Sequence, residues 1–516
     1  MPDINDNAAA YFVDRHATSA YSGKTAFVEG AGRGRTLSFA DLARETGRLA
    51  HLFERHGVRR EERAAMLVLD QIEFPIIFWG SLKAGVVPIA LNTLLTAKVY
   101  DAILRDSRAR ALFVSHELLP VIEPVLKTNP YLDKVFVIGG ESDGAHLSFE
   151  KELTRCEIRE PIPARADECA FWLYSSGSTG EPKGVRHVHG SLKFTADTYG
   201  SQVLQIERDD IVFSAAKMFF AYGLGNAMTF PLSVGATTVL LSSRPTPDSV
   251  FDIMRRFKPT VFCGVPTLYA AMVAQMESGK GGVASPLRRC ISAGEALPAE
   301  VGRKWLKLTG TDILDGVGST EMLHIFLSNR VGEVVYGTSG VAVPGYDVRV
   351  VDETGHEVEA GQVGELLVRG ASSASDYWNQ RKKSRLTFEG EWTRTGDKYE
   401  KAADGRLIYQ GRTDDMFKVS GVWVSPFEVE QTLVTHPSVL EAAVVPALDE
   451  NGLEKPMAFV VLKPEATGEH LVDELKDLVK EQIGMWKYPR WVKVIPELPK
   501  TATGKIQRFK LKAEAR

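Results

Sequence analysis

The sequence predicts an α/β protein: a large N-terminal domain of mostly parallel, helix-covered sheets with a strand-rich subdomain, then a small mobile α+β C-terminal domain. Through the first two thirds of the chain, short apolar runs alternate with stretches of helical periodicity, which is the rhythm of βαβ units. From Val334 the pattern changes to short alternating segments broken by Gly and Asp, which is typical of strands and turns. Because 516 residues exceed one ordinary core, we expect two domains, at 1–413 and 414–516.

Each predicted element rests on its own periodicity. Apolar residues at helical spacing predict early helices at 40–56, 74–84 and 98–105. Short apolar runs predict strands at 64–69, 86–90, 111–114, 135–138, 211–214, 238–241, 261–264 and 289–293. Alternating segments predict strands at 346–351 and 364–369. Beyond Gly411 we expect a compact module with strands at 439–446 and 457–462 and helices at 426–434 and 471–483. The polar, Gly-bearing segment 404–415 is the best candidate for a hinge.

The composition excludes several classes of protein. Hydrophobic residues make up 44% and charged residues 25%, the proportions of a soluble globular protein. The net charge of −4 argues against a nucleic-acid partner. No apolar run approaches the roughly 18 residues that span a bilayer, and no secretory signal pattern opens the chain. The four cysteines form no C-x-x-C pair, so neither a zinc site nor a disulfide framework is indicated. We expect a cytoplasmic enzyme without a membrane partner.

A Ser- and Gly-rich segment, Tyr-Ser-Ser-Gly-Ser-Thr-Gly-Glu-Pro-Lys-Gly at 174–184, follows an apolar strand candidate at 170–173. Gly177 and Gly180 let the backbone approach a ligand closely, and Lys183 supplies charge for β- and γ-phosphates. Hydroxyl donors come from Ser175, Ser176, Ser178 and Thr179. The segment is not a Walker loop, because no Ser or Thr follows Lys183. A flexible surface loop rarely combines these features after a buried strand, so we expect a phosphate-binding loop.

This segment resembles the phosphate-binding loop of the adenylate-forming superfamily, which includes acyl- and aryl-CoA synthetases, firefly luciferases and adenylation domains of peptide synthetases. Further segments resembling that family's motifs follow in its order, at 315–321, 392–397, 411–421 and 499–505, and the resemblance spans about 24–511. It implies ATP, Mg²⁺ and coenzyme A as cofactors.

The resemblance also implies roles for single residues. Thr320 would contact the α-phosphate, and Glu321 would hold magnesium. Those residue types suit the chemistry, because a carboxylate attacking the α-phosphorus must overcome like-charge repulsion. Val317 stands where the family usually has an aromatic residue that packs on adenine. Further contacts with ATP or coenzyme A are implied for Gly294, Glu295, Asp315, Gly316, Lys418, Ser420 and Gly421.

Four residues nearer the C-terminus complete the implied machinery. Asp397 resembles the family's ribose ligand and Arg412 its second ribose contact. Asp414 matches the hinge about which the small domain rotates. Lys505, in the frame Pro-Lys-Thr-Ala-Thr-Gly-Lys, resembles the lysine that enters the active site for adenylation. A point charge on a flexible stem suits that role, because it can bridge the attacking carboxylate and the α-phosphate oxygens.

The expected acid is a small aromatic carboxylic acid. The segments 219–224 and 322–326 resemble those of benzoate–CoA ligases, a subgroup of the aryl-CoA synthetases. That resemblance implies an acid site lined by Ala221, Tyr222, Gly223, Gly318, His324 and Ile325. Glycines and aromatic faces suit a flat ring, which loses little entropy on binding. The alternative for Phe219 and Phe220 is ordinary core packing.

Together these features predict an AMP-forming acid–thiol ligase of the benzoate–CoA ligase type. Few residues follow Lys505, so we expect free coenzyme A as the acceptor; a homodimer is a possible assembly. The alternatives are a medium-chain fatty acyl-CoA synthetase, a stand-alone adenylating enzyme serving a carrier protein, and a silent nucleotide-binding scaffold. The scaffold is disfavoured because five implied functional residues occur together: Thr320, Glu321, Asp397, Arg412 and Lys505.

Overall fold

The computed structural model describes residues 5–31, 34–140, 146–176, 182–419, 422–450, 452–463, 470–500 and 506–515, except for the side chains of Ser176, Val422 and Trp423. The chain divides into two compact units. The first comprises Met1–Tyr336, Gly340–Asp347 and Val368–Thr393, and the second Gly337–Ser339, Val348–Leu367 and Arg394–Arg516. The hinge expected at Asp414 stays a prediction.

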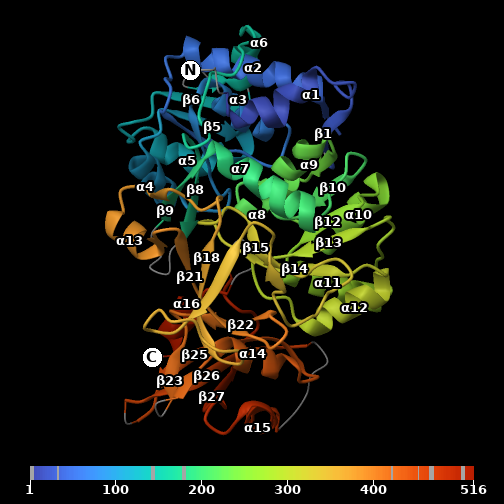
Figure 1. Ribbon diagram of the computed structural model, residues 1–516, viewed down its shortest axis with the longest axis vertical. Helices are drawn as coiled ribbons and strands as arrows, with labels where there is room; N and C mark the ends of the chain where they lie inside the picture. The colour runs from blue at the N-terminus through green and yellow to red at the C-terminus, as the bar shows by residue number, and fades with distance from the viewer. Residues whose placement is uncertain are drawn as a thin grey trace. The chain divides into compact units, whose positions relative to one another are not determined.

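An eight-stranded sheet in the first unit has the order β19-β9-β8-β4-β3-β5-β6-β7. Parallel pairing joins the strands from β8 through to β7. The strands are β3 (Arg63–Leu67), β4 (Val87–Ala90), β5 (Ala111–Ser115), β6 (Lys134–Ile138), β7 (Leu147–Ser148), β8 (Cys169–Ser176), β9 (Pro182–Val188) and β19 (Asp376–Tyr377). The helices in this part of the chain are α2 (Phe39–Arg55), α3 (Glu73–Ala84), α4 (Ala97–Ser107), α5 (Leu119–Leu126) and α6 (Phe149–Thr154). Figure 1 shows α2 and α3 in the blue N-terminal part of the ribbon.

Local sequence explains where the first helices begin and end. Ser38 caps α2, because its hydroxyl accepts from the Asp41 amide while the Asp41 side chain accepts from the Ser38 amide. Helix α3 ends at Gly85, whose φ of 68° is a conformation that glycine adopts without a steric cost. Strands β4 and β5 are buried at every residue, as parallel strands covered on both faces are.

The second sheet of this unit has nine strands in the order β16-β15-β14-β13-β12-β10-β11-β1-β2. Its strands are β1 (Thr25–Glu29), β2 (Thr36–Ser38), β10 (Ile211–Ser214), β11 (Thr237–Leu240), β12 (Val261–Gly264), β13 (Arg289–Ser292), β14 (Ile313–Gly318), β15 (Ile325–Ser328) and β16 (Val341–Ala342). The helices between them are α7 (His189–Thr195), α8 (Ala221–Leu224), α9 (Phe230–Val234), α10 (Pro247–Phe257), α11 (Pro266–Glu277) and α12 (Ala299–Thr309). Strands β10 to β14 are parallel where they pair, whereas β15 returns antiparallel to β14.

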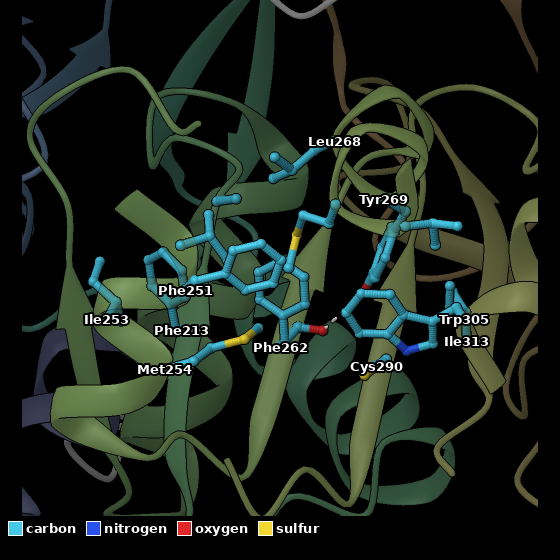
Figure 2. Packing of buried hydrophobic residues seen from close by; sticks show 14 of the residues in the cluster. Phe213, Phe251, Ile253, Met254, Phe262, Leu268, Tyr269, Cys290, Trp305 and Ile313 are labelled. Carbon is cyan, nitrogen blue, oxygen red and sulfur yellow. Dashed lines mark hydrogen bonds between the residues drawn. The ribbon is translucent and has the colours of Figure 1, made fainter. Parts of the chain in front are cut away.

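Aromatic side chains fill the core beside this second sheet. Figure 2 shows Phe262 from β12, Tyr269 from α11 and Trp305 from α12 gathered around the strands. Tyr269 meets Trp305 edge-on with ring centroids 4.8 Å apart, and Phe262 packs on Tyr269 at 5.3 Å. The Tyr269 hydroxyl donates to the Ile291 carbonyl at 2.9 Å, so its buried polar end is satisfied.

The second unit is rich in strands and ends in an α+β module. Its strands and those leading into it are β17 (Asp347–Val351), β18 (Val363–Arg369), β21 (Trp392–Lys401), β22 (Leu407–Arg412), β23 (Phe417–Val419) and β24 (Val422–Val424). The module contains a sheet of β25 (Val439–Leu448), β26 (Glu454–Leu462) and β27 (Trp491–Val494), with helices α14 (Pro426–Val434), α15 (Leu471–Ile483) and α16 (Arg508–Glu514). Val429, Leu433, Val444, Val460 and Leu475 form its core.

The predicted fold class is confirmed, and the bounds of the predicted elements differ from the observed ones by at most three residues. Helices α14 and α15 have the predicted bounds. The π-helical segments η1 (Ala10–Asp14), η3 (Ala196–Val203) and η4 (Gly225–Thr229) were not predicted, because a widened helical turn leaves the apolar periodicity nearly unchanged. Within the part of the chain that the structure describes, no helix has the length and apolarity to cross a membrane.

Replacing Trp305 with Ala tests the packing of the core beside the second sheet. Trp305 is 0% exposed, so Trp305→Ala should lower the free energy of unfolding of this unit by about 3–5 kcal/mol. Leu308→Ala is the matched control on the same helix, because its side chain is 42% exposed and the expected change is within about 0.5 kcal/mol. Urea denaturation followed by circular dichroism measures both; equal effects of the two substitutions would contradict this account of the core.

Candidate active site

The β8–β9 hairpin holds both ends of the predicted phosphate loop. Antiparallel pairing places Ser175 opposite Lys183 and Tyr174 opposite Gly184. A Cβ added at Gly184 would lie 3.2 Å from the Tyr174 ring, so the small residue lets the two strands close. The Ser175 hydroxyl is buried, and no described group hydrogen-bonds to it. Gly177, Ser178, Thr179 and Gly180 lie outside the described residues, as does the side chain of Ser176.

Lys183 and Glu321, far apart in the sequence, lie against one side chain, Tyr377. The Tyr377 hydroxyl donates to Glu321 Oε1 at 2.8 Å, and Lys183 Nζ lies 4.9 Å from the centroid of the Tyr377 ring. Strand β19 brings Tyr377 there, because it pairs antiparallel with β9 and sets Tyr377 opposite Val185. Sequence reasoning missed Tyr377, because nothing in the local sequence marks its pairing with β9.

His187 fixes the backbone of the predicted α-phosphate residue. Its ring Nε2 lies 2.8 Å from the Thr320 carbonyl oxygen, and its ring stacks on Phe171 with centroids 5.2 Å apart. Burial lowers the pKa of His187 to about 4, so the ring is neutral near pH 7 and donates to that carbonyl through Nε2. The Ala374 amide donates to the Glu321 carbonyl at 2.7 Å, which fixes the next residue. His187 was also missed by sequence reasoning.

Strand β14 carries the residues Asp315, Gly316 and Gly318 against β15. Cβ atoms added at Gly316 and Gly318 would lie 2.8 Å from the Leu327 carbonyl and 2.4 Å from the His324 carbonyl, so both positions require glycine.

Asp315 is buried, and burial raises the pKa of its carboxyl to about 8. The Leu297 amide, which donates a hydrogen bond to this carboxyl, acts in the opposite direction and lowers the pKa. Val317 is half-buried. Gly294 lies two residues after the end of β13 and has a φ of 97°. The next residue, Glu295, is half-buried.

The predicted acid-binding residues of α8 and the β14–β15 turn come together. His324 Nε2 lies 3.3 Å from the Tyr222 carbonyl, and Ile325 is the strand partner of Gly318. Burial lowers the pKa of His324 to about 3, so its ring is uncharged. A Cβ at Gly223 would lie 2.0 Å from the Lys217 carbonyl. Ala221 opens the same helix.

Further aromatic residues in this cluster were not predicted. Tyr199 in η3 and Phe230 in α9 pack on the His324 ring with centroids 5.0 and 4.6 Å away. Phe219 is 5% exposed and packs on Phe220 at 4.4 Å, so the core-packing alternative fits Phe219. Tyr199 lies in the unpredicted π-helical segment η3 and Phe230 directly follows another, η4, so their approach to His324 had no signal in the sequence.

In the second unit the two predicted ribose residues form an ion pair. Asp397 and Arg412 are partners across β21 and β22, and Arg412 Nη1 donates to Asp397 Oδ1 at 2.9 Å. Gly396 leaves space for the Arg412 side chain, because a Cβ at position 396 would lie 3.0 Å from Arg412 Nη2. Asp414 lies in the turn after β22, and Lys418 is exposed on β23. Ser420, Gly421 and Lys505 lie outside the described residues.

Among the described residues, no group of three or more His, Cys, Asp or Glu side chains could hold a metal ion. Mg²⁺ in nucleotide sites takes one or two carboxylates and completes its shell with phosphate oxygens and water. Glu321 fits that pattern, since Tyr377 donates to one of its carboxylate oxygens and no described group donates a hydrogen bond to the other.

Two parts of the chain match known protein families. The family profile AMP-binding enzyme matches residues 13–378, and the profile AMP-binding enzyme C-terminal domain matches residues 428–505. The chain belongs to the AMP-binding enzyme family. The predicted membership of the adenylate-forming superfamily is therefore confirmed.

Within that family the chain is similar to ligases of aromatic acids. A 4-hydroxybenzoate–CoA/benzoate–CoA ligase of Rhodopseudomonas palustris is 51% identical over 515 residues, covering 99% of this chain and 95% of the relative. A benzoate–CoA ligase of Thauera aromatica is 51% identical over 510 residues, covering 98% and 96%. The crystal structure of a benzoate CoA ligase from Burkholderia xenovorans has a TM-score of 0.91 at 46% identity, covering 98% of this chain and 99% of that one. The predicted resemblance to benzoate–CoA ligases is confirmed.

The buried His187 predicts a dependence of stability on pH. Its pKa is about 4 in the folded protein and about 6.5 when unfolded, so between these values the unfolded state binds more protons. The free energy of unfolding should therefore fall as the pH drops from about 6.5 towards 4. His187→Gln keeps a donor but does not titrate, so it should make this dependence shallower, and the buried His189 and His324 should account for the part that persists. Denaturant titrations at pH 7 and 5 measure it, and the exposed His116→Gln should behave like the wild type.

Proposed function

We propose that the protein is an ATP-dependent aryl-CoA ligase. It joins an aromatic carboxylic acid to AMP with release of pyrophosphate, and then transfers the acyl group to the thiol of coenzyme A. The observation that carries this proposal is the convergence of Lys183 and Glu321 on Tyr377, with Glu321 in the same β14–β15 turn as His324. The similarity of nearly the whole chain to benzoate–CoA ligases supports the aromatic acid as substrate.

In the first half-reaction an oxygen of the acid attacks the α-phosphorus of ATP, and pyrophosphate leaves. Lys183 would attract the β- and γ-phosphates, and Thr320 would donate to an α-phosphate oxygen. Glu321 would hold Mg²⁺, whose charge screens the phosphate oxygens. Asp397 would accept hydrogen bonds from the ribose hydroxyls, and Arg412, which donates to Asp397 across the strand pair, would be the second contact with the ribose. Lys505 would bring positive charge to the acid and α-phosphate together.

The residues around His324 suit a flat, uncharged ring. His324 is neutral and packed among Tyr199, Tyr222 and Phe230, so the ring of the acid would meet aromatic faces and no fixed charge. Gly318 and Gly223 bring backbone, not side chains, to this region. Such surroundings favour a rigid ring over a flexible chain, because the ring loses less entropy on binding.

In the second half-reaction the coenzyme A thiol attacks the acyl carbon, and AMP leaves. We propose that the small domain turns about Asp414 between the two steps, withdrawing Lys505 and presenting the segment that includes Lys418. One site would then perform two reactions by exchanging the face of a mobile domain.

A panel of acids tests the substrate class. Benzoate and hydroxy- or aminobenzoates should give acid-dependent AMP release that rises when coenzyme A is supplied, whereas hexanoate should give little. Measuring AMP with and without coenzyme A separates a ligase from a stand-alone adenylating enzyme. Turnover of hexanoate without turnover of benzoate would favour a medium-chain fatty acyl-CoA synthetase, and exchange of pyrophosphate without any acid would favour a nucleotide-binding scaffold.

Lys505→Ala tests the division between the half-reactions. Loss of one positioned charge should slow acyl-AMP formation by about 100- to 1000-fold while largely sparing thioester formation from supplied acyl-AMP. Single-turnover assays of each step measure the two rates. Lys510→Ala, at an exposed position of α16, is the matched control and should leave both rates unchanged. Equal losses in both steps for Lys505→Ala would refute the proposed role.

A further inference from the structure

We propose that Tyr377 is a positioning residue that sets the metal-binding carboxylate of Glu321 and the phosphate-binding ammonium of Lys183 relative to each other. This inference rests on the proposed function, because it concerns the ATP site of the same reaction. It adds a residue outside the predicted motifs and assigns it to orientation, not to contact with the reacting atoms.

The hydroxyl of Tyr377 orients Glu321. It donates to Oε1 at 2.8 Å, and Tyr377 is 3% exposed, so bulk water competes little for this hydrogen bond. A phenol donates without neutralising the carboxylate, so Glu321 keeps its charge and the second oxygen for a cation. Partners that hold a metal ligand in this way typically change metal affinity by about 10–100-fold when removed.

The ring of Tyr377 faces Lys183. The 4.9 Å between Lys183 Nζ and the ring centroid is within the range of a cation–π interaction. The Lys183 ammonium therefore lies beside Tyr377, the residue that holds Glu321. Lys183 and the Glu321 carboxylate do not form an ion pair with each other. An ion pair between Lys183 and Glu321 would neutralise both charges that the phosphates and the metal need.

Backbone pairing fixes Tyr377 itself. The Tyr377 amide donates to Ser384 Oγ at 3.0 Å, and the Trp378 amide donates to the Gly184 carbonyl at 2.8 Å. Next to it, Arg186 and Asp376 form a two-pronged ion pair with both distances 2.6 Å. Tyr377 is thus tied to the hairpin that carries the phosphate loop, whereas Glu321 follows β14 of the other sheet. The hydrogen bond from Tyr377 to Glu321 therefore joins the carboxylate on the metal side of the site to its phosphate side.

Three substitutions separate the two parts of this role. Tyr377→Phe removes the hydroxyl and keeps the ring, and Tyr377→Leu removes both. Tyr336→Phe is the matched control, because the Tyr336 hydroxyl also donates to a carboxylate, Asp312 Oδ1, at 2.9 Å. Binding of Mn²⁺ is measured by electron paramagnetic resonance with a non-hydrolysable ATP analogue and no acid, so the readout does not depend on the acid substrate or on turnover.

For Tyr377→Phe we expect about tenfold weaker Mn²⁺ binding, an unchanged KM for the aromatic acid, and recovery of AMP release at high Mg²⁺. Tyr377→Leu should in addition weaken binding of the nucleotide analogue at saturating Mn²⁺, because Lys183 loses the ring. In a Glu321→Gln background, Tyr377→Phe should have no further effect on Mn²⁺ binding. Tyr336→Phe should bind both ligands like the wild type.

Unchanged Mn²⁺ binding by folded Tyr377→Phe would overturn the proposal, as would a loss of AMP release that high Mg²⁺ does not restore. If Tyr377→Phe does not fold, Tyr377→Leu decides: combined with Glu321→Gln it must bind Mn²⁺ no more weakly than Glu321→Gln alone, and additive losses would overturn the proposal. Failure of the proposed function is a separate outcome: the wild type would then bind Mn²⁺ and nucleotide normally and release no AMP with any aromatic acid.

Discussion

The candidate site depends on the hydrogen-bonded pairing of β9 with β8 on one side and with β19 on the other. A chain with a net charge of −4 has no general attraction for a polyanion, so a few cations must be placed accurately. Pairing with β8 places Lys183 at the end of a hairpin, and pairing with β19 supplies the ring that faces it. Arg412 is placed in the same manner, across a strand pair from Asp397. Strand pairing thus positions the few cations that an anionic ligand needs, whereas a basic protein attracts such a ligand through its overall surface charge.

Burial determines which groups near the site carry charge. His187 and His324 have depressed pKa values, and Asp315 has a raised one, all mainly through loss of solvent. The two histidines are therefore neutral near pH 7 and Asp315 is mostly protonated there, so these groups shape the backbone and the proposed acid-binding region and add little charge. The charged side chains of Lys183 and Glu321 lie instead against Tyr377. The separation keeps the electrostatics of the phosphate region distinct from the aromatic region.

The sequence was informative where the signal is local. Apolar periodicity located the parallel strands and the helices that cover them, and the resemblance of short motifs to those of the adenylate-forming superfamily implied Thr320, Glu321 and Asp397 as candidates. It did not indicate Tyr377, because the role of Tyr377 arises from pairing between strands nearly two hundred residues apart. It did not indicate His187 either, because His187 contacts a carbonyl that is distant in the sequence. Lys505 and the tip of the phosphate loop stay predictions, since they lie outside the described residues.

Two glycines of the proposed acid-binding region restrict how its selectivity can be altered. At Gly223 and Gly318 an added methyl group would meet main-chain carbonyls at 2.0 and 2.4 Å, and main chain cannot yield as a side chain can. Mutational routes to a different acid are therefore closed at these two positions. Ala221 is only half-buried and already carries a side chain, so a library aimed at new substrates is better directed at this position.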